Sequence, residues 1–333
     1  MIRFGIAGFG LHAAKRLMPG FALAQNCKVV ALSRRDQVKA QEASKKYGIP
    51  HLFTSTEDLA RCPEVDAVFV ATPNVCHLSD VLACASAGKP VLCEKPMAMN
   101  AGECRQMIEA VSNAGVSLGV AQVFRFEEST ARLRRHVAEG DIGRPVLARA
   151  EFSFPAISHV RSWMYSRAIA GGGPIADIGV HCIDALRFVL QDEVVLIGAL
   201  AHSDEHSGDV EAAASLTLEF RRGTLAAVLV SLRAQYRTPF EIVGDAGVLR
   251  ADDALNVERP IRIELRRDGK VIREETVSNH LAYARQVDAF AAALEGGEAF
   301  PSPGEEGLKN QMCLDAAYRS LATGRVESVE ASG

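Results

Sequence analysis

The chain has 333 residues, of which 48% are hydrophobic and 23% are charged, and its formal net charge is −4. This length suffices for two domains that each bury a core. The negative balance excludes a basic field that would attract nucleic acid or an anionic membrane. No apolar run approaches the roughly 20 residues that span a bilayer, so we expect no membrane association.

Two features favour a cytoplasmic protein. The N-terminal segment MIRFGIAGFG reads directly as a strand and lacks the parts of a signal peptide. The eight cysteines are scattered without a C-x2-C pair, which fits a reducing compartment. We expect no structural zinc and no other metal site.

Residues 1–122 alternate short apolar runs with helical stretches, which is typical of a parallel sheet covered on both faces. Strands are predicted at 3–9, 28–33, 67–72, 90–94 and 117–122. Helices are predicted at 13–25, 37–47, 76–87 and 101–114, with C-terminal caps at Gly48, Gly88 and Gly115. We therefore predict an α/β domain with a doubly wound parallel sheet, the Rossmann arrangement.

Residues 123–333 are rich in strands that follow one another without intervening helices. Strands are predicted at 145–154, 194–202, 212–220, 223–236, 239–245, 247–252, 261–267 and 270–277, the last two joined at Asp268-Gly269. Helices are predicted at 130–139, 175–190, 280–295 and 304–323. This pattern predicts an α+β domain with a large open antiparallel sheet. The C-terminal helices are expected to pack back on the first domain.

The segment GFGLHA at residues 8–13 follows the first predicted strand and opens a helix. In this G-x-G-x-x-A pattern, Gly8 permits the turn, Gly10 lets a pyrophosphate approach, and Ala13 lets the helix pack on the strand. A purely structural turn is the alternative. We expect cofactor contacts from Gly8, Phe9, Gly10 and Leu11.

The second predicted strand ends in Ser33-Arg34-Arg35 where a dinucleotide site usually has an acid that binds the ribose hydroxyls. A hydroxyl followed by guanidinium groups suits a 2′-phosphate instead. We therefore predict NADP(H) as the cofactor, bound through Ser33 and Arg34, with NAD(H) less favoured. The alternative is a pair of solvated turn arginines, and a contact from Arg35 stays open.

Other polar residues follow the later strands of this domain, at the edge where ligands bind such sheets. Expected cofactor contacts there are Thr72, Pro73, Asn74, His77, Glu94, Lys95 and Gln122. For His77 a local capping role is an equal alternative. Arg125 is a further candidate to border the nicotinamide or to bridge the domains.

A glycine cluster at residues 171–173 opens the predicted helix that carries Asp177, His181 and Asp184. Glycines there allow a ligand to approach the backbone. The spacings i, i+4 and i+3 put the three polar residues on one helical face, where a carboxylate can orient an imidazole. A structural hydrogen bond is the alternative for this pair.

Together these motifs resemble the Gfo/Idh/MocA oxidoreductases. The resemblance rests on the glycine turn, Ala71-Thr72-Pro73-Asn74 with His77, Glu94-Lys95-Pro96, and the glycine cluster with Asp177, His181 and Asp184. Within the family, the layout is similar to the branch of 1,5-anhydrofructose reductases and NADP-dependent sugar dehydrogenases, which Trp163 also fits.

The resemblance implies hydride transfer between a nicotinamide and a sugar or polyol. It implies that Lys95 contacts nicotinamide and substrate, that His181 exchanges the hydroxyl proton, and that Asp177 assists. It also implies a homodimer or homotetramer formed through the open sheet. Substrate contacts are expected from Lys95, Arg161, Trp163, Asp177 and His181, although a surface or interface loop is an equal reading of 159–165.

Two other functions compete with a reductase or dehydrogenase. A nicotinamide-cofactor sensor or regulator would not need Lys95 or His181, and both are present. A redox-neutral, NAD-dependent glycosidase would be expected to carry an acid near Ser33, and none occurs before Asp36.

Overall fold

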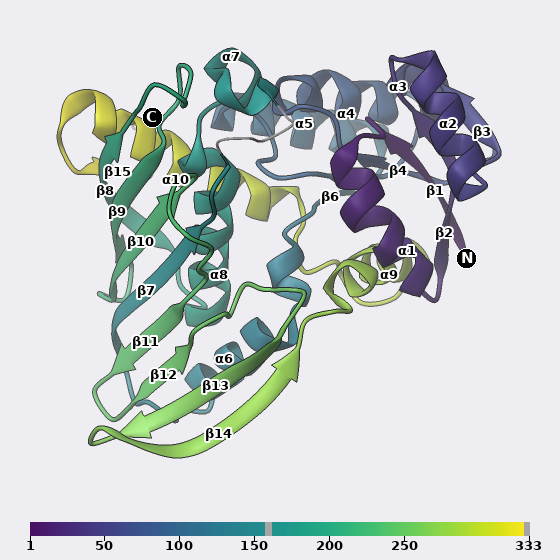
Figure 1. The fold of residues 1–333 in the computed structure, drawn as a ribbon. Helices are drawn as coiled ribbons and strands as arrows, with labels where there is room; N and C mark the ends of the chain where they lie inside the picture. The colour runs from purple at the N-terminus through teal and green to yellow at the C-terminus, as the bar shows by residue number, and fades with distance from the viewer. Residues whose placement is uncertain (157–161, 330–333) are drawn as a thin grey trace. The chain divides into compact units, whose positions relative to one another are not determined.

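The computed structural model describes residues 1–156 and 162–329. The chain divides into two compact units (Figure 1). The first unit comprises Met1–Val123 and Leu281–Lys309, and the second comprises Phe124–His280 and Asn310–Gly333. The segment after residue 280 thus returns to the first unit before the chain ends in the second.

The first unit contains a six-stranded sheet in the order β3-β2-β1-β4-β5-β6, and every neighbouring pair is parallel. The strands are β1 Ile2–Ala7, β2 Cys27–Ser33, β3 His51–Phe53, β4 Ala67–Val70, β5 Val91–Cys93 and β6 Leu118–Val120. This topology confirms the predicted Rossmann arrangement. The sequence did not predict β3, which is short and lacks a fully buried residue.

Helices cover both faces of this sheet because both faces are apolar. Val68 and Val70 of β4 belong to one core, whereas the alternate residues Ala67 and Phe69 belong to another. The helical segments are η1 Ala13–Leu17, α1 Met18–Leu23, α2 Gln37–Tyr47, α3 Thr56–Ala60, η2 Asn74–Cys76, α4 His77–Ser86, α5 Ala101–Ala114 and α9 Ala282–Leu294.

The second unit contains a nine-stranded sheet in the order β14-β13-β12-β11-β7-β10-β9-β8-β15. Its pairs are antiparallel except β7 with β10, which is parallel. The strands are β7 Pro145–Ser153, β8 Val194–His202, β9 Ala213–Phe220, β10 Leu225–Ser231, β11 Phe240–Gly244, β12 Val248–Ala251, β13 Pro260–Arg267, β14 Lys270–Ser278 and β15 Glu327–Ser328. The predicted α+β domain is confirmed, with one parallel pair that the sequence did not reveal.

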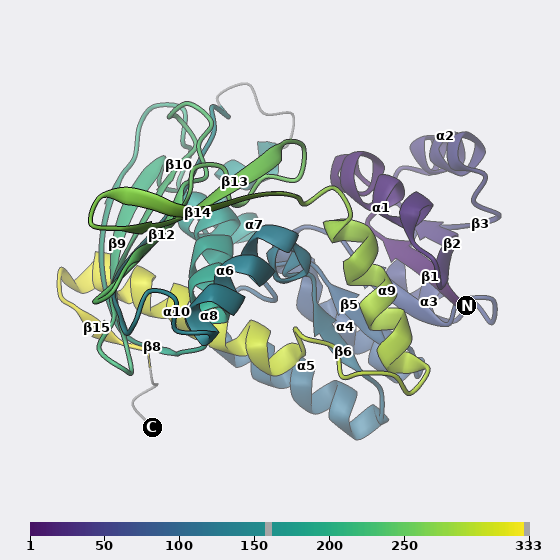
Figure 2. The same ribbon diagram turned by 90° about the horizontal axis from the view of Figure 1, so that it is seen from below.

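One face of the large sheet is covered and the other is open. Alternate residues of β9 and β10 are buried, as expected when one face packs on helices. Figure 2 shows α6 (Glu128–Ala138) and α8 (Val180–Leu190) on the covered side. The other helical segments are η3 Val123–Phe126, η4 Ser162–Tyr165, α7 Arg167–Ala170, η5 Ile175–Gly179 and α10 Gly304–Thr323.

The structure contains glycine caps and a hairpin turn at positions that the sequence predicts. Gly48 and Gly115 have φ of 66° and 64° and end α2 and α5, as left-handed helix caps do. Asp268 and Gly269 both have positive φ and join β13 to β14. In the described part of the chain, no helix is long and apolar enough to cross a membrane.

Candidate functional site

The parallel sheet brings most of the predicted cofactor residues to one edge. Parallel strands end at the same side of a sheet, and open α/β sheets bind ligands there. Ser33 is the last residue of β2, and the segments that follow β1, β2, β4, β5 and β6 contain Gly8, Phe9, Gly10, Leu11, Arg34, Thr72, Pro73, Asn74, Glu94, Lys95 and Gln122. The edge therefore collects these residues from five separate parts of the chain.

The glycine turn needs its two glycines for different reasons. Gly8 has a φ of 78°, and a Cβ there would lie 2.7 Å from the Cα of Thr72. Beside Gly10 the space is open, because its nearest neighbour would be the carbonyl oxygen of Gly8 at 3.7 Å. The side chain of Phe9 lies in the core at 2% exposure, so any contact from Phe9 to a cofactor falls to its backbone.

The end of β2 is tied to this turn. The carbonyl oxygen of Ser33 accepts hydrogen bonds from Gly8 N at 3.1 Å and Phe9 N at 2.9 Å. The guanidinium of Arg34 donates through Nη1 to the carbonyl oxygen of Phe9 at 3.1 Å. Ser33 is buried, Arg34 is half-buried and Arg35 is exposed. Arg34 is thus held beside the glycine turn with other guanidinium N–H groups available for an anion.

The nearest acid beyond β2 has another role. Asp36 is the N-cap of α2, where its side chain accepts from Lys39 N at 3.1 Å. This hydrogen bond and the Lys39 ammonium at 3.3 Å hold the pKa of Asp36 below its ordinary value. Asp36 therefore acts as a helix cap.

His77 is held between two loops of the first unit. Its ring is fully buried, with Nδ1 3.0 Å from the carbonyl oxygen of Pro96 and Nε2 3.0 Å from that of Thr72. His77 thereby joins the loops that follow β4 and β5. Nearby, the Thr72 hydroxyl donates to Asp80 at 2.6 Å, and burial raises the pKa of Asp80. These contacts give His77 a structural role, and its contact with a cofactor stays a prediction.

Lys95 follows β5 and is half-buried. Its backbone N–H donates to Oε2 of Glu94 at 3.1 Å, and Oε1 of the same carboxylate lies 2.8 Å from Nε2 of His12. Burial opposes the charged form of Glu94, but His12 and Lys95 outweigh it and lower the pKa of Glu94. Sequence analysis missed His12, although a histidine inside a glycine turn was a visible signal.

Gln122 lies just beyond β6 and is 1% exposed. Its Oε1 has no hydrogen-bond partner among the described residues. A buried amide oxygen in this state is costly unless a bound group donates to it. A dinucleotide fits three features of this edge: Gln122, the open space beside Gly10, and the N–H groups at the start of the helix that follows the glycine turn.

In the second unit, Asp177 and His181 lie at the junction of two helix types. Asp177 belongs to the π-helical turn η5, and His181 is the second residue of α8. π-helical turns occur frequently at functional sites. Asp177 is half-buried, whereas His181 is buried and packs its ring 4.4 Å from the Phe124 ring.

The glycine cluster before η5 accommodates the chain itself. A Cβ at Gly172 would lie 1.6 Å from the hydroxyl of Tyr318, and one at Gly173 would lie 2.2 Å from the backbone oxygen of Glu211. At Gly172 and Gly173 the group that approaches closely is therefore part of the chain itself. The carboxylate of Glu211 accepts from Gly173 N at 3.0 Å, Ile175 N at 3.1 Å and the Tyr318 hydroxyl at 2.9 Å.

Glu211 therefore caps the helical segment that carries Asp177 and His181. A carboxylate at a helix N-terminus satisfies free N–H groups and is stabilised by the helix dipole. Sequence analysis missed both Glu211 and Tyr318. No sequence signal identified them, because each lies far along the chain from the glycines that it contacts.

Asp184 and Arg125 form a buried ion pair. Arg125 donates from Nη2 to Asp184 at 2.6 Å, and Asn310 donates to the same carboxylate oxygen at 2.7 Å. The side chains of Arg125 and Asp184 are 6% and 1% exposed. This pairing within the second unit assigns both residues to the support of α8.

The predicted substrate loop is described only in part. Arg161 and His159 lie outside the described residues. Trp163 lies in η4 and is half-buried, and the Tyr165 hydroxyl donates to the carbonyl oxygen of Ala156. The contribution of Arg161 and Trp163 to substrate binding stays a prediction.

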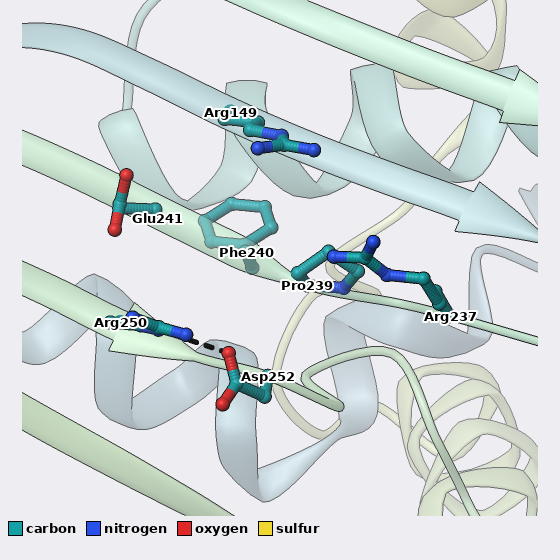
Figure 3. Close-up of a pocket in the computed structure, with 7 residues that line it drawn as sticks. All are labelled: Arg149, Arg237, Pro239, Phe240, Glu241, Arg250 and Asp252. Carbon is teal, nitrogen blue, oxygen red and sulfur yellow. Dashed lines mark hydrogen bonds and ion pairs between the residues drawn. The ribbon is translucent and has the colours of Figure 1, made fainter.

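A pocket also lies on the large sheet, and none of the site residues described above lines it. Figure 3 shows its lining side chains on β7, β11 and β12 and on the segment before β11. Its three arginines face carboxylates: Arg149 lies 2.9 Å from Glu151, and Arg250 lies 3.0 Å from Asp252. Arg237 lies 3.7 Å from Glu151. Mutual ion pairing accounts for these charges.

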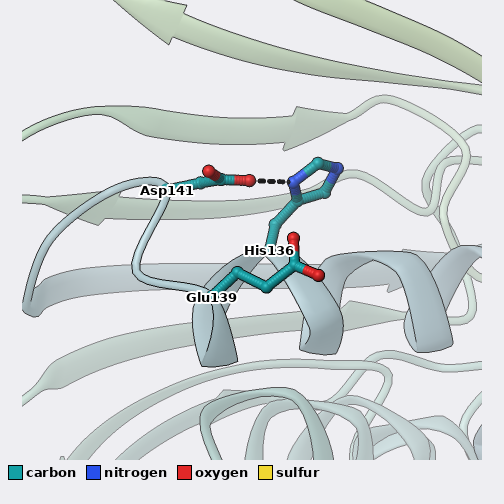
Figure 4. Close-up of side chains that lie close together, drawn as sticks. All are labelled: His136, Glu139 and Asp141. Atoms are coloured by element: carbon teal, nitrogen blue, oxygen red, sulfur yellow. Dashed lines mark hydrogen bonds and ion pairs between the residues drawn. The ribbon is translucent and has the colours of Figure 1, made fainter.

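One group of side chains in residues 1–156 and 162–329 has the spacing of metal ligands: His136, Glu139 and Asp141 (Figure 4). Both ring nitrogens of His136 already face carboxylates, with Nδ1 2.5 Å from Asp141 and Nε2 2.8 Å from Glu275. The hydrogen bond from His136 lowers the pKa of Asp141. We interpret the group as ion pairs that link α6 to β14.

Comparison with known proteins supplies a family for both halves of the chain. Residues 2–122 match the family model "Oxidoreductase family, NAD-binding Rossmann fold", and residues 130–250 match "GFO/IDH/MocA C-terminal domain". A 1,5-anhydro-D-fructose reductase from Ensifer adhaerens is 32% identical over 332 residues, which cover 99% of each chain. A D-xylose 1-dehydrogenase (NADP(+)) 2 from Haloferax volcanii is 31% identical over 96% of this chain and 98% of its own.

The fold is similarly matched among solved structures. The crystal structure of aldose-aldose oxidoreductase from Caulobacter crescentus, complexed with glycerol, has a TM-score of 0.90 and 27% sequence identity. The match covers 98% of this chain and 99% of that one. The similarity therefore extends through both units rather than through the nucleotide-binding sheet alone.

Proposed function

Since the chain belongs to the Gfo/Idh/MocA family of oxidoreductases, we propose that it transfers a hydride between NADP(H) and a hydroxyl-bearing or ketone carbon of a sugar or polyol. The observation that carries this proposal is the carboxyl edge of the parallel sheet. There an open glycine turn, an arginine suited to phosphate and Lys95 follow strands of one sheet.

The preference for NADP(H) over NAD(H) rests on Arg34. A guanidinium beside the adenosine ribose would form charge-assisted hydrogen bonds with a 2′-phosphate. The first acid after Ser33 is Asp36, and Asp36 caps α2. The D-xylose dehydrogenase relative is named for NADP(+), which agrees with this choice.

When bound, the nicotinamide supplies or accepts the hydride. Lys95 stabilises the negative charge that develops on the substrate oxygen, because a positioned ammonium favours an alkoxide. His181 donates a proton to that oxygen during reduction and removes it during oxidation, a role worth roughly 10²–10⁴-fold in rate. Asp177 assists His181 from the preceding turn, and Glu211 with Tyr318 holds the helical segment that carries both.

The relatives suggest the substrate class. Two of them are named for a sugar or anhydrosugar, and the matching crystal structure is of an aldose-aldose oxidoreductase. Trp163, eight residues before the glycine cluster in the chain, offers an aromatic face of the kind that carbohydrates bind. We assign substrate contacts to Lys95, Arg161, Trp163, Asp177 and His181.

The open sheet suits self-association into a homodimer or homotetramer. Leu147 of β7 and Leu225 of β10 are directly paired across the sheet and are 50% and 46% exposed. Adjacent exposed leucines on a sheet face favour burial against another surface.

The eight cysteines are free thiols, which fits a cytoplasmic location.

The experiment is a screen of aldoses, keto sugars, inositols and dicarbonyls, coupled to NADP(H) absorbance. We expect steady cofactor turnover with at least one sugar or polyol. Lys95→Ala and His181→Ala should each lower kcat by about 10²-fold or more while NADPH affinity stays within about threefold. Near-parental turnover in both variants would refute the catalytic roles.

The same screen separates the two alternatives. A redox-neutral glycosidase would release sugar without net cofactor consumption. A sensor would bind NADP(H) with neither activity. Either pattern would replace the proposed function.

A further inference from the structure

His12 connects the glycine turn to the loop that carries Lys95. Its Nε2 lies 2.8 Å from Oε1 of Glu94, a residue 82 positions further along the chain. The other oxygen of that carboxylate accepts the backbone N–H of Lys95 at 3.1 Å. One carboxylate therefore spans the two segments that follow β1 and β5.

We propose that His12 is a positioning residue that donates Nε2–H to Glu94, fixes the carboxylate that holds the Lys95 backbone, and so sets where Lys95 lies relative to the glycine turn. The inference rests on the proposed function, because the position of Lys95 matters to a rate only where Lys95 is catalytic. His12 itself acts through Glu94.

The surroundings make this carboxylate dependent on its donors. The Glu94 side chain is 12% exposed and that of His12 is 28% exposed, so water satisfies Glu94 poorly. Burial disfavours the charge on Glu94, yet His12 and Lys95 keep its pKa below the ordinary value. Removing His12 would leave a shielded carboxylate with one donor fewer, and the side chain would be expected to reorient toward solvent.

The backbone around Glu94 makes the link effective. Glu94 N donates to the carbonyl oxygen of Val70 at 2.9 Å, which fixes the backbone of Glu94 to the end of β4. His12 lies in the helix that starts after the glycine turn, and its ring lies edge-on to Tyr283 at 6.2 Å. Both ends of the link are therefore held, and the Glu94 side chain is the adjustable part between them.

The test compares His12→Leu, which removes the donor, with His12→Gln, which retains an N–H near the position of Nε2. Glu94→Ala removes both acceptor oxygens and therefore both bonds. Glu103→Gln is the matched control, because Glu103 also accepts a backbone N–H, from Met99 at 3.1 Å, without contacting His12.

The first measurement needs no activity: it is the hydrogen-exchange rate of the Lys95 amide in the protein without cofactor. We expect faster exchange in His12→Leu and Glu94→Ala, and parental exchange in His12→Gln and Glu103→Gln. Unchanged exchange in His12→Leu would overturn the inference. This result stands apart from the proposed function, since it does not depend on turnover.

The second measurement is kcat with the NADPH dissociation constant. His12→Leu should lower kcat about 10- to 100-fold, as a misplaced catalytic group does, with affinity within about threefold. His12→Gln should recover most of the loss. A loss confined to NADPH affinity would make His12 a cofactor contact instead, and equal losses in both His12 variants would also overturn the proposal. Absence of turnover in the parent protein would refute the proposed function and leave the exchange result to decide the role of His12.

Discussion

The glycine turn after β1 and the glycine cluster before η5 differ in what occupies the space beside them. At Gly10 the nearest atom to an added Cβ would be 3.7 Å away. At Gly172 and Gly173 that atom would be 1.6 Å and 2.2 Å away, from Tyr318 and Glu211. The space beside Gly10 is open to a ligand, whereas the space beside Gly172 and Gly173 is filled by the chain. A glycine in a sequence thus indicates a close approach without identifying the group that approaches.

Gly173→Ala should have the largest effect on stability. Its Cβ would overlap the backbone of Glu211, which cannot move aside as a flexible side chain can. We expect the free energy of unfolding to fall by about 2 to 3 kcal/mol, as in overpacked cores. Urea denaturation of the parent and the variant measures this difference, and an unchanged midpoint would mean that the cluster is looser than described.

Arg34→Ala tests the cofactor side of the comparison. Losing a guanidinium that contacts a 2′-phosphate should weaken NADPH binding about 10- to 100-fold, the size expected for charged hydrogen bonds. NADH binding should change little, because NADH has no such phosphate. Fluorescence titration gives both dissociation constants. Equal losses for both cofactors would show that Arg34 only stabilises the glycine turn through Phe9.

Gly10→Ala should separate binding from stability. The added methyl group meets open space in the protein alone but occupies the place of a pyrophosphate. We expect NADPH affinity to fall about tenfold while the unfolding free energy stays within about 0.5 kcal/mol. Parental NADPH affinity together with lost stability would show that the chain itself fills the space beside Gly10, as it does beside Gly172 and Gly173.

Tyr318→Phe should have a modest effect. It removes the hydrogen bond from the hydroxyl to Glu211 but leaves the two N–H donors from Gly173 and Ile175. A loss of about 1 kcal/mol in unfolding free energy is expected. Because the hydroxyl also lies closest to Gly172, Gly172→Ala should be better tolerated in the Tyr318→Phe background. Strictly additive losses would exclude contact between the two positions.

The smallest effect concerns the dependence of stability on pH near the glycine turn. The pKa of Glu94 is lower in the folded protein than its ordinary value of 4.5. A carboxylate of this kind stabilises the fold above its unfolded pKa, and that contribution is lost as the pH falls through the folded pKa. The stability difference between the parent and Glu94→Gln should therefore shrink as the pH falls below the ordinary value of 4.5. A difference that persists unchanged far below that pH would contradict a lowered pKa of Glu94.

The sequence predicted the structure best where neighbouring residues in the chain determine it. Hydrophobic periodicity and caps predicted helices at 37–47, 101–114 and 304–323 with the bounds of α2, α5 and α10. The family and both fold types were also predicted and are confirmed. Short elements such as β3 and α3 were missed, because three to five residues carry too little periodicity.

The structure was needed where two distant segments meet. The two backbone carbonyls that face the ring nitrogens of His77 belong to loops that follow different strands. Glu211 and Tyr318 carry no local motif, and their role follows from contacts with glycines far away in the chain. The parallel pairing of β7 with β10 is likewise a matter of strand order that alternation does not encode.

The most direct test of hydride transfer uses NADPH that carries deuterium at both C4 positions and a keto sugar that supports turnover. We predict that deuterium appears on the carbinol carbon of the product, detected by mass spectrometry, in the parent protein and far more slowly in Lys95→Ala. A product without deuterium, formed while the cofactor retains both deuterium atoms, would contradict the proposal that this chain is an NADP(H)-dependent sugar oxidoreductase.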